Sequence, residues 1–375
     1  MGVRLLHGVP AWTAGAVILL LAVATAVGAV TLLAGPPPTA LPQSTPAAAD
    51  GIWISHDELA RLPQSGPAWE RMKSAADGPL GPATVADFTA THDVNTLAVA
   101  LVYGRTGDAS YREKAADAIM AVIGTETTGQ AVMLSRNVVC YVIAADLIDL
   151  ASLDPDRDAQ FRAWIDQART RDFPDRTMVE NDELRTNNHG RMAGAARAAI
   201  AVYLDDRIDL GRAAQVFRGF LGAHESYRGF EYRYGLTWQS DPAQPAGILP
   251  VGATKEGHDL DGAMPEEMRR GCEFQWPPCV TGYAWEGLGA ALVEANILSR
   301  AGYDVWEWED RALLRAVRFL ERMEQEHGGW WATGDDAWQP WLVNEVYGTS
   351  LPTTQATRGK NMAWTDWMYS AAREP

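Results

Sequence analysis

The side chains best suited to chemistry in this sequence lie in the segment Arg185-Thr186-Asn187-Asn188-His189-Gly190. An apolar run from Met192 to Leu204 follows and predicts a helix, so one of the two Asn residues can cap it. The other amide and the imidazole suit removal of a proton from the carbon beside a uronate carboxylate. That reaction needs hydrogen-bond donors that partly neutralise the carboxylate charge, and a base with a pKa near neutrality. The plain alternative is a helix cap followed by a structural His.

A second polar group lies between residues 261 and 286. An Arg side chain can bind a carboxylate through two parallel hydrogen bonds, and a Tyr hydroxyl can protonate a departing glycosidic oxygen. Surface pairing of the Arg and Glu side chains, with plain helix packing of the Tyr, would explain the group without chemistry. Its members are Asp261, Glu266, Glu267, Arg269, Arg270, Tyr283, Trp285 and Glu286.

The elements that must position these groups are predicted to be helical hairpins, because apolar residues recur at helical spacing. Strand-like alternation is scarce. Hairpins packed side by side bury their apolar faces, and a closed row of them gives an α/α toroid. The predicted fold is therefore mainly α, an incomplete α/α toroid. The expected helix pairs are the helix from Asn95 onward, which carries Leu97, Leu101 and Val102, with Tyr111–Ile123, then Asn137–Leu150 with Asp158–Arg171, Asn188–Leu204 with Leu210–His224, and Tyr283–Ala301 with Trp306–Glu326.

The segment from Tyr227 to Cys279 breaks the helical pattern and is rich in Gly, Pro and aromatic residues. A loop region of this length inside a compact domain favours a functional role, so we expect part of the active cleft there. Eleven of the 15 Trp residues lie from Trp238 onward. We expect two or three of them to face a ligand, and the others to fill the core.

The N-terminus carries Arg4, then no Lys, Arg, Asp or Glu until Asp50, and an apolar run from Ala11 to Leu33. At about 1.5 Å per residue this run can cross a bilayer. A cleaved signal peptide and a membrane anchor are both open, and either one exports the remainder to the periplasm or the cell exterior. The expected organisation is a signal or anchor at 1–34, a Pro- and Ala-rich linker at 35–50, and one catalytic domain at 51–375.

The three cysteines fit an oxidising compartment if one of them stays unpaired. Cys272 and Cys279 bracket a Pro-rich turn and are expected to form a short-loop disulfide, while Cys140 lies in an apolar run. Three unpaired thiols are the alternative.

The charge balance excludes nucleic acid as a partner. Acidic residues number 48 and basic residues 32, giving a net charge of -16, and no Lys/Arg stripe could neutralise phosphates. An anionic substrate must therefore meet a local Arg pocket. The sequence holds no Cys/His metal spacing, phosphate-binding Gly loop or Gly-x-Ser-x-Gly motif, so no cofactor is expected. We expect a monomer.

The Asn187-Asn188-His189 motif at a helix start and the Asp-Gly-x-x-Pro-x-Glu-x-x-Arg pattern that ends at Arg270 resemble the α/α-toroid alginate lyases and related uronan lyases. The likeness spans most of residues 90–326. It implies that Asn188 neutralises a uronate carboxylate with help from Arg270, that His189 is the base or its partner, and that a Tyr is the acid, or both acid and base.

The remaining candidate site residues come partly from the resemblance and partly from the residue types themselves. In the family the catalytic Tyr follows the Arg more closely than Tyr283 follows Arg270 here. Tyr283 is the nearest Tyr that could take this role, and Tyr232 and Tyr234 remain alternatives. Arg136 and Asn137 are expected to open the third hairpin, where the family tends to bind substrate, although capping by Ser135 explains that stretch equally well. The predicted substrate-binding residues are Asn187, Arg136, Asn137, Arg269, His258 and Trp285.

Two other functions remain open at this point. A glycoside hydrolase on the same fold needs two carboxylates across a cleft, for which Asp261, Glu267 and Glu286 are available. A surface glycan-binding protein would keep the fold without turnover. The leading hypothesis is a polysaccharide lyase that cleaves an anionic, uronate-containing glycan by metal-independent β-elimination.

Overall fold

The computed structural model describes residues 51–232, 234, 236–356 and 359–369, without the side chains of 127 and 128. All of them belong to the contact unit that begins at Ala40. The expected signal or anchor at 1–34 and the linker at 35–50 lie outside the described residues and stay predictions. Among the residues that are described, no helix is long and apolar enough to span a bilayer.

The described chain is mainly helical, with one two-stranded antiparallel hairpin that pairs Thr254 with Asp259. The α-helices are α1 (His56–Arg61), α2 (Pro67–Asp77), α3 (His92–Thr106), α4 (Ala109–Ala121), α5 (Ala131–Leu147), α6 (Leu150–Leu153), α7 (Pro155–Thr170), α8 (Met178–Leu184), α9 (Asn188–Tyr203), α10 (Arg207–Leu221), α11 (Pro265–Met268), α12 (Tyr283–Arg300), α13 (Trp308–His327), α14 (Gln339–Tyr347) and α15 (Thr365–Met368). The short elements are η1 (Thr125–Thr128), η2 (Leu236–Trp238), η3 (Val305–Glu307), η4 (Gly334–Asp336), β1 (Thr254–Lys255) and β2 (His258–Asp259).

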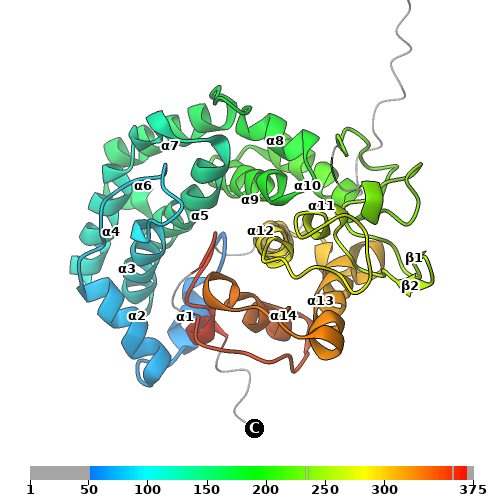
Figure 1. The fold of residues 1–375 in the computed structure, drawn as a ribbon. Helices are drawn as coiled ribbons and strands as arrows, with labels where there is room; N and C mark the ends of the chain where they lie inside the picture. The colour runs from blue at the N-terminus through cyan, green and yellow to red at the C-terminus, as the bar shows by residue number, and fades with distance from the viewer. Residues whose placement is uncertain (1–50, 233, 235, 357–358, 370–375) are drawn as a thin grey trace, which may run out of the picture. The chain divides into compact units, whose positions relative to one another are not determined.

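The helices form hairpins in which one helix is inside and its partner outside (Figure 1). The inner helices α3, α5, α9 and α12 pack side by side in that order. The outer helices α4, α10 and α13 pack against α3, α9 and α12 respectively. This alternation is the mainly helical α/α toroid, so the predicted fold class is confirmed.

Local chemistry explains where the hairpins turn. Gly107 ends α3 with φ 70°, a left-handed conformation that an L side chain rarely adopts. Asp108 then caps α4 by accepting a hydrogen bond from the Ser110 backbone N–H at 2.9 Å. At α8, Thr177 and Glu180 form a reciprocal capping box.

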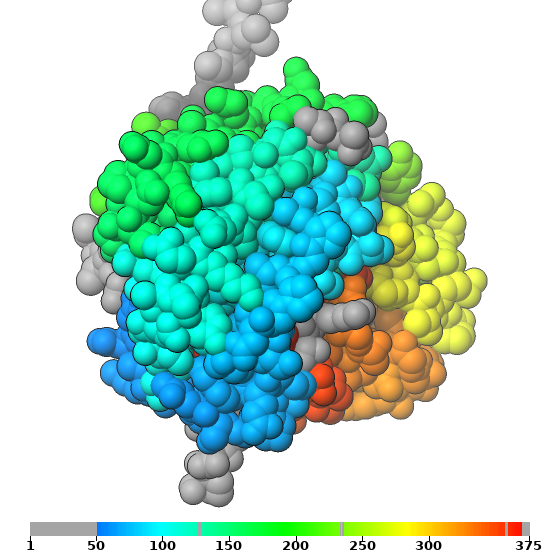
Figure 2. All heavy atoms as spheres, turned by 90° about the vertical axis from the view of Figure 1, so that its left-hand side faces the viewer, coloured from blue at the N-terminus to red at the C-terminus, as the bar shows by residue number. Residues whose placement is uncertain are grey.

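The C-terminal residues return to the first helices. Asp366 in α15 forms an ion pair with Arg71 in α2 at 2.6 Å. The indole N–H of Trp364 donates to the carbonyl of Val94 in α3 at 2.7 Å. Figure 2 shows the red C-terminal residues beside the blue N-terminal helices. These contacts bring the end of the hairpin row back to its beginning.

One helix boundary was predicted wrongly. Helix α5 begins at Ala131, not near Asn137, so Arg136 and Asn137 lie inside the helix, and Ser135 is a buried helical residue. The reason is that Ala131 and Leu134 are themselves buried and continue the apolar face upstream.

Candidate active site

Asn188 is the best-connected residue of the predicted site. Asn187 caps α9 by accepting a hydrogen bond from the Gly190 backbone N–H at 3.5 Å, which leaves the Asn188 amide free for other partners. The buried Asn188 donates its backbone N–H to Glu267 and its amide N–H to Glu286 at 2.9 Å. Asn188 therefore joins the start of α9 to α11 and α12.

Gly190 allows the turn before α9 to be this tight. A Cβ at that position would collide with the backbone carbonyl of Arg185. The segment from Arg185 to Gly190 consequently folds back on itself and presents Asn188 and His189 from consecutive positions.

His189 is influenced by four charged side chains. Its Nδ1 lies 2.9 Å from the Arg185 guanidinium and 3.9 Å from the Asp175 carboxylate. Burial lowers the pKa of the His189 imidazole, the Arg185 charge lowers it further, and Asp175 opposes both. The Arg270 charge also lowers the pKa of His189, and the Glu286 charge raises it.

Arg270 and Tyr283 meet face to face. The guanidinium carbon of Arg270 lies 3.6 Å from the centre of the Tyr283 ring, close for a cation–π contact. Between them the chain makes the predicted excursion, closed by the Cys272–Cys279 disulfide with the Cα atoms 5.8 Å apart. Cys140 is free and buried, so the cysteine prediction is confirmed. The disulfide loop returns the chain so that Tyr283 begins α12 beside Arg270.

The rival tyrosines lie elsewhere. Tyr232 packs edge-on against Phe230, and burial raises its pKa. Tyr234 is 56% exposed and lies under Arg269, 5.2 Å from the guanidinium carbon to the ring centre.

Two carboxyl groups and a lysine complete the cluster. Glu267 is buried, which raises the pKa of its carboxyl, and the neighbouring Glu286 charge raises it further. Glu286 also binds Lys360 at 3.3 Å, and Lys360 lies 3.8 Å from Asp336. Burial raises the pKa of Asp336 to about 7. Lys360 and Asp336 could not be predicted from the sequence, since no motif links residues so far from Asn188 along the chain.

The other predicted substrate-binding residues separate into two groups. Arg136 lies 4.0 Å from Asp335 and acts electrostatically on Asp336, so it borders the Lys360 end of the cluster. Its neighbour Asn137 donates to the Asp87 carbonyl at 3.1 Å.

The contacts of Trp285, His258 and Arg269 are with residues other than Asn188. Trp285 is buried and donates its indole N–H to the Trp330 carbonyl at 2.6 Å, so it is a core residue, contrary to the prediction. Its place in α12 turns it inward. His258 stacks on Trp276 with ring centres 4.3 Å apart, and Arg269 pairs with Glu273 at 3.3 Å. Among the described residues, no group of three or more His, Cys, Asp or Glu is arranged to hold a metal ion.

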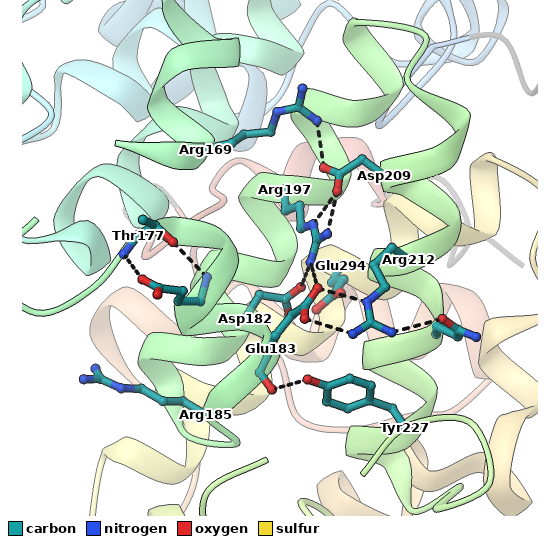
Figure 3. A network of polar contacts seen from close by, with 12 residues as sticks. Arg169, Thr177, Asp182, Glu183, Arg185, Arg197, Asp209, Arg212, Tyr227 and Glu294 are labelled. Atoms are coloured by element: carbon teal, nitrogen blue, oxygen red, sulfur yellow. Dashed lines mark hydrogen bonds and ion pairs between the residues drawn. The ribbon is translucent and has the colours of Figure 1, made fainter. Parts of the chain in front are cut away.

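A network of charged side chains joins α8, α9 and α10, and Figure 3 shows Arg197 of α9 between Asp182 of α8 and Asp209 of α10. Fully buried Arg191 binds Asp182 and Glu294, each at 3.1 Å, and so joins α9 to α8 and α12. Arg197 continues the network to Asp182 at 3.1 Å. A Cβ at Gly194 would collide with both carboxylates, which explains a glycine inside a helix. The network fixes how α8 meets α9.

Replacing Arg191 with Met is expected to destabilise the fold by about 3–5 kcal/mol, because the buried Asp182 and Glu294 carboxylates lose their Arg191 ion-pair partner. Chemical denaturation measures this. Arg207→Met is the matched control, since Arg207 and its partner Asp205 are 83% and 84% exposed, and little change is expected there. Equal effects in the two variants would contradict a structural role for the network.

The comparisons with known proteins agree with this geometry. Residues 70–225 match the alginate lyase family model. The fold is similar to that of an alginate lyase from Bacteroides ovatus, with a TM-score of 0.50 and 16% identity over 79% of this chain and 91% of the other. A search of curated proteins gave no match. The resemblance predicted from the Asn187-Asn188-His189 motif is thus confirmed over residues 70–225, the part of the chain that matches the alginate lyase family model.

Proposed function

We propose that this protein is a polysaccharide lyase that cleaves an anionic, uronate-containing glycan by β-elimination. The family match and the shared fold support a polysaccharide lyase. The observation that carries the substrate class and mechanism is the contact of Arg270 with Tyr283 beside Asn188 and His189.

In this mechanism the uronate carboxylate is bound by donors from Asn188, His189 and Arg270. Their hydrogen bonds stabilise the negative charge that develops when the proton on C5 is removed. The C5–H electron pair becomes the C4=C5 double bond, the C4–O4 bond breaks, and O4 leaves with its electron pair. The Tyr283 oxygen takes up the C5 proton and delivers it to O4, so that the two proton transfers balance.

The local charge suits an anion although the whole chain carries -16. Arg185 and Arg270 are both close enough to act on His189. Burial and the Glu286 charge raise the pKa of the Glu267 carboxyl, and Lys360 lies 3.3 Å from Glu286 and compensates its charge. Both effects reduce the negative charge of the cluster and so the repulsion of a uronate.

Incubating the full-length chain with alginate, glucuronan and glycosaminoglycans tests this proposal. Elimination leaves an unsaturated uronate at each new non-reducing end, so ultraviolet absorbance is expected to rise with at least one polymer. New reducing ends without absorbance would indicate a hydrolase. Bound oligosaccharide with neither product would indicate a binding protein.

Hydrolysis has one observation in its favour, the proximity of Glu267 and Glu286. Both carboxyl groups, however, bind the same residue, Asn188, whereas a hydrolase needs them on opposite sides of the glycosidic bond. The third candidate, Asp261, forms an ion pair with Arg315 at 2.7 Å. Elimination is therefore the better proposal.

A further inference from the structure

The proton on His189 can be located from its neighbours. Two charged groups compete for Nδ1: the Arg185 guanidinium nitrogen at 2.9 Å and the Asp175 carboxylate oxygen at 3.9 Å. The first distance is a hydrogen bond and the second is too long to be one. Asp175 Oδ1 accepts the Ala131 backbone N–H at 3.2 Å, whereas Oδ2, the oxygen nearer His189, has no hydrogen-bond partner among the described residues.

An Arg guanidinium only donates hydrogen bonds, so Nδ1 of His189 must accept this one. An imidazole nitrogen that accepts carries no proton. Since burial and the Arg185 charge lower the pKa of His189, the ring is neutral near pH 7, and its single proton lies on Nε2. This orientation is opposite to that of a His whose Nδ1–H is held by a carboxylate and whose Nε2 is then a free base.

Arg185 is itself held firmly in place. Its backbone N–H donates to the Asn181 carbonyl at 3.1 Å, and its own carbonyl accepts from buried Arg191 at 3.5 Å. Its guanidinium also lies 3.8 Å from Asp175. The side chain that contacts His189 therefore starts from a backbone fixed by the buried network.

We propose that Arg185 is a positioning residue that fixes the proton of His189 on Nε2, so that His189 meets the uronate carboxylate as a hydrogen-bond donor. This inference rests on the proposed elimination for its functional part. Removal of the C5 proton then falls to the Tyr283 oxygen in its deprotonated form. Tyr283 returns that proton to the departing O4, and the two transfers balance.

Nitrogen-15 spectra of the full-length chain with labelled histidine test the tautomer without any substrate. The sequence has seven His residues, and the His189 signals are those lost in His189→Gln. A protonated Nε2 with an unprotonated Nδ1 is the expected result. In Arg185→Met the pKa of His189 is expected to rise, and the proton is expected to shift toward Nδ1 and Asp175. A protonated Nδ1 in the unsubstituted protein would overturn the proposal, whether or not any polymer is cleaved.

Arg218→Met is the matched control for the substitution. Arg218 is 31% exposed against 27% for Arg185, and it pairs with Glu309 at 3.0 Å in the α10–α13 contact. The His189 signals are expected to stay unchanged in this variant. A similar shift in both variants would mean that loss of an ion pair, not loss of the donor, moves the proton.

The proposed role of His189 as a hydrogen-bond donor can be tested by kinetics on whichever polymer yields unsaturated ends. His189→Ala is expected to lower turnover by about 10² or more. A Gln side chain carries an N–H near the position of Nε2 but cannot act as a base. His189→Gln should therefore retain about ten to a hundred times the activity of His189→Ala, the factor for one hydrogen bond to a charged group. Equal inactivity of the two variants would assign the base to His189 and refute the donor role.

Discussion

Tyr283→Phe is expected to lower turnover by about 10² to 10⁴ while leaving the free energy of unfolding nearly unchanged. The substitution removes only the hydroxyl, and the ring remains to pack under Arg270, 3.6 Å from its guanidinium carbon. That guanidinium places a permanent positive charge beside the Tyr283 side chain, which in the proposed mechanism carries negative charge before it takes the C5 proton and again after it gives that proton to O4. Initial rates of unsaturated-uronate formation measure the loss, and thermal unfolding checks the fold.

Tyr232→Phe and Tyr234→Phe are the matched controls, and both should remain active. Tyr232 packs on Phe230, and Tyr234 lies under Arg269, so neither ring is in contact with Arg270 in the manner of Tyr283. If Tyr283→Phe stays active while one of these two is inactive, the acid lies in the loop before α11. The role given to the disulfide excursion would then have to be abandoned.

The helical hairpins could be predicted from the sequence because their signals are local. The expected helix Asn188–Leu204 is observed as Asn188–Tyr203, and Tyr283–Ala301 as Tyr283–Arg300. Apolar spacing and capping residues act within a few turns, so a single segment carries the information. The early start of α5 was missed because Ala131 and Leu134 follow a Gly-rich turn with no side-chain cap.

The candidate residues Asn188 and His189 could also be predicted from the sequence. They adjoin a helix start where only one of the two amides is needed as a cap. The charged residues around Asn188 and His189 could not be predicted in this way. Lys360 reaches Glu286 across 74 residues of sequence, and no periodicity records such a contact. The direction in which Trp285 points was lost for a related reason: a Trp in a helix looks the same in sequence whether it faces the core or a ligand.

The role of Arg185 shows what only the structure could add. The residue stands in the motif segment, four positions before His189, but its type alone predicts a surface charge or a carboxylate ligand. Because Nδ1 accepts from Arg185 at 2.9 Å, the proton of the neutral imidazole lies on Nε2. The nitrogen that faces the substrate is then proposed to donate a hydrogen bond, where the sequence alone suggested a base. The sequence motif thus predicts which groups react, and the direction of the hydrogen bonds supports the roles proposed for them.

Asn188→Ala is expected to lower turnover by about 10² to 10³, the usual loss when one donor to a developing anion is removed. The loss should appear mainly in kcat, because the negative charge on the carboxylate grows as the C5 proton leaves. Steady-state kinetics on the polymer that yields unsaturated ends measure it. The amide is held by Glu286 at 2.9 Å, so removing it also frees that carboxylate beside the substrate.

Asn296→Ala separates this effect from loss of a buried amide in general. Asn296 is a buried residue of α12 that donates to the Trp53 carbonyl at 3.3 Å, on a different contact of the same helix. Its replacement should cost stability and leave kcat near normal. Asn188→Asp, which keeps the shape but replaces the N–H donor with a charge between Glu267 and Glu286, should be at least as inactive as Asn188→Ala. Near-normal kcat in both Asn188 variants would remove this residue from the mechanism and return it to helix capping.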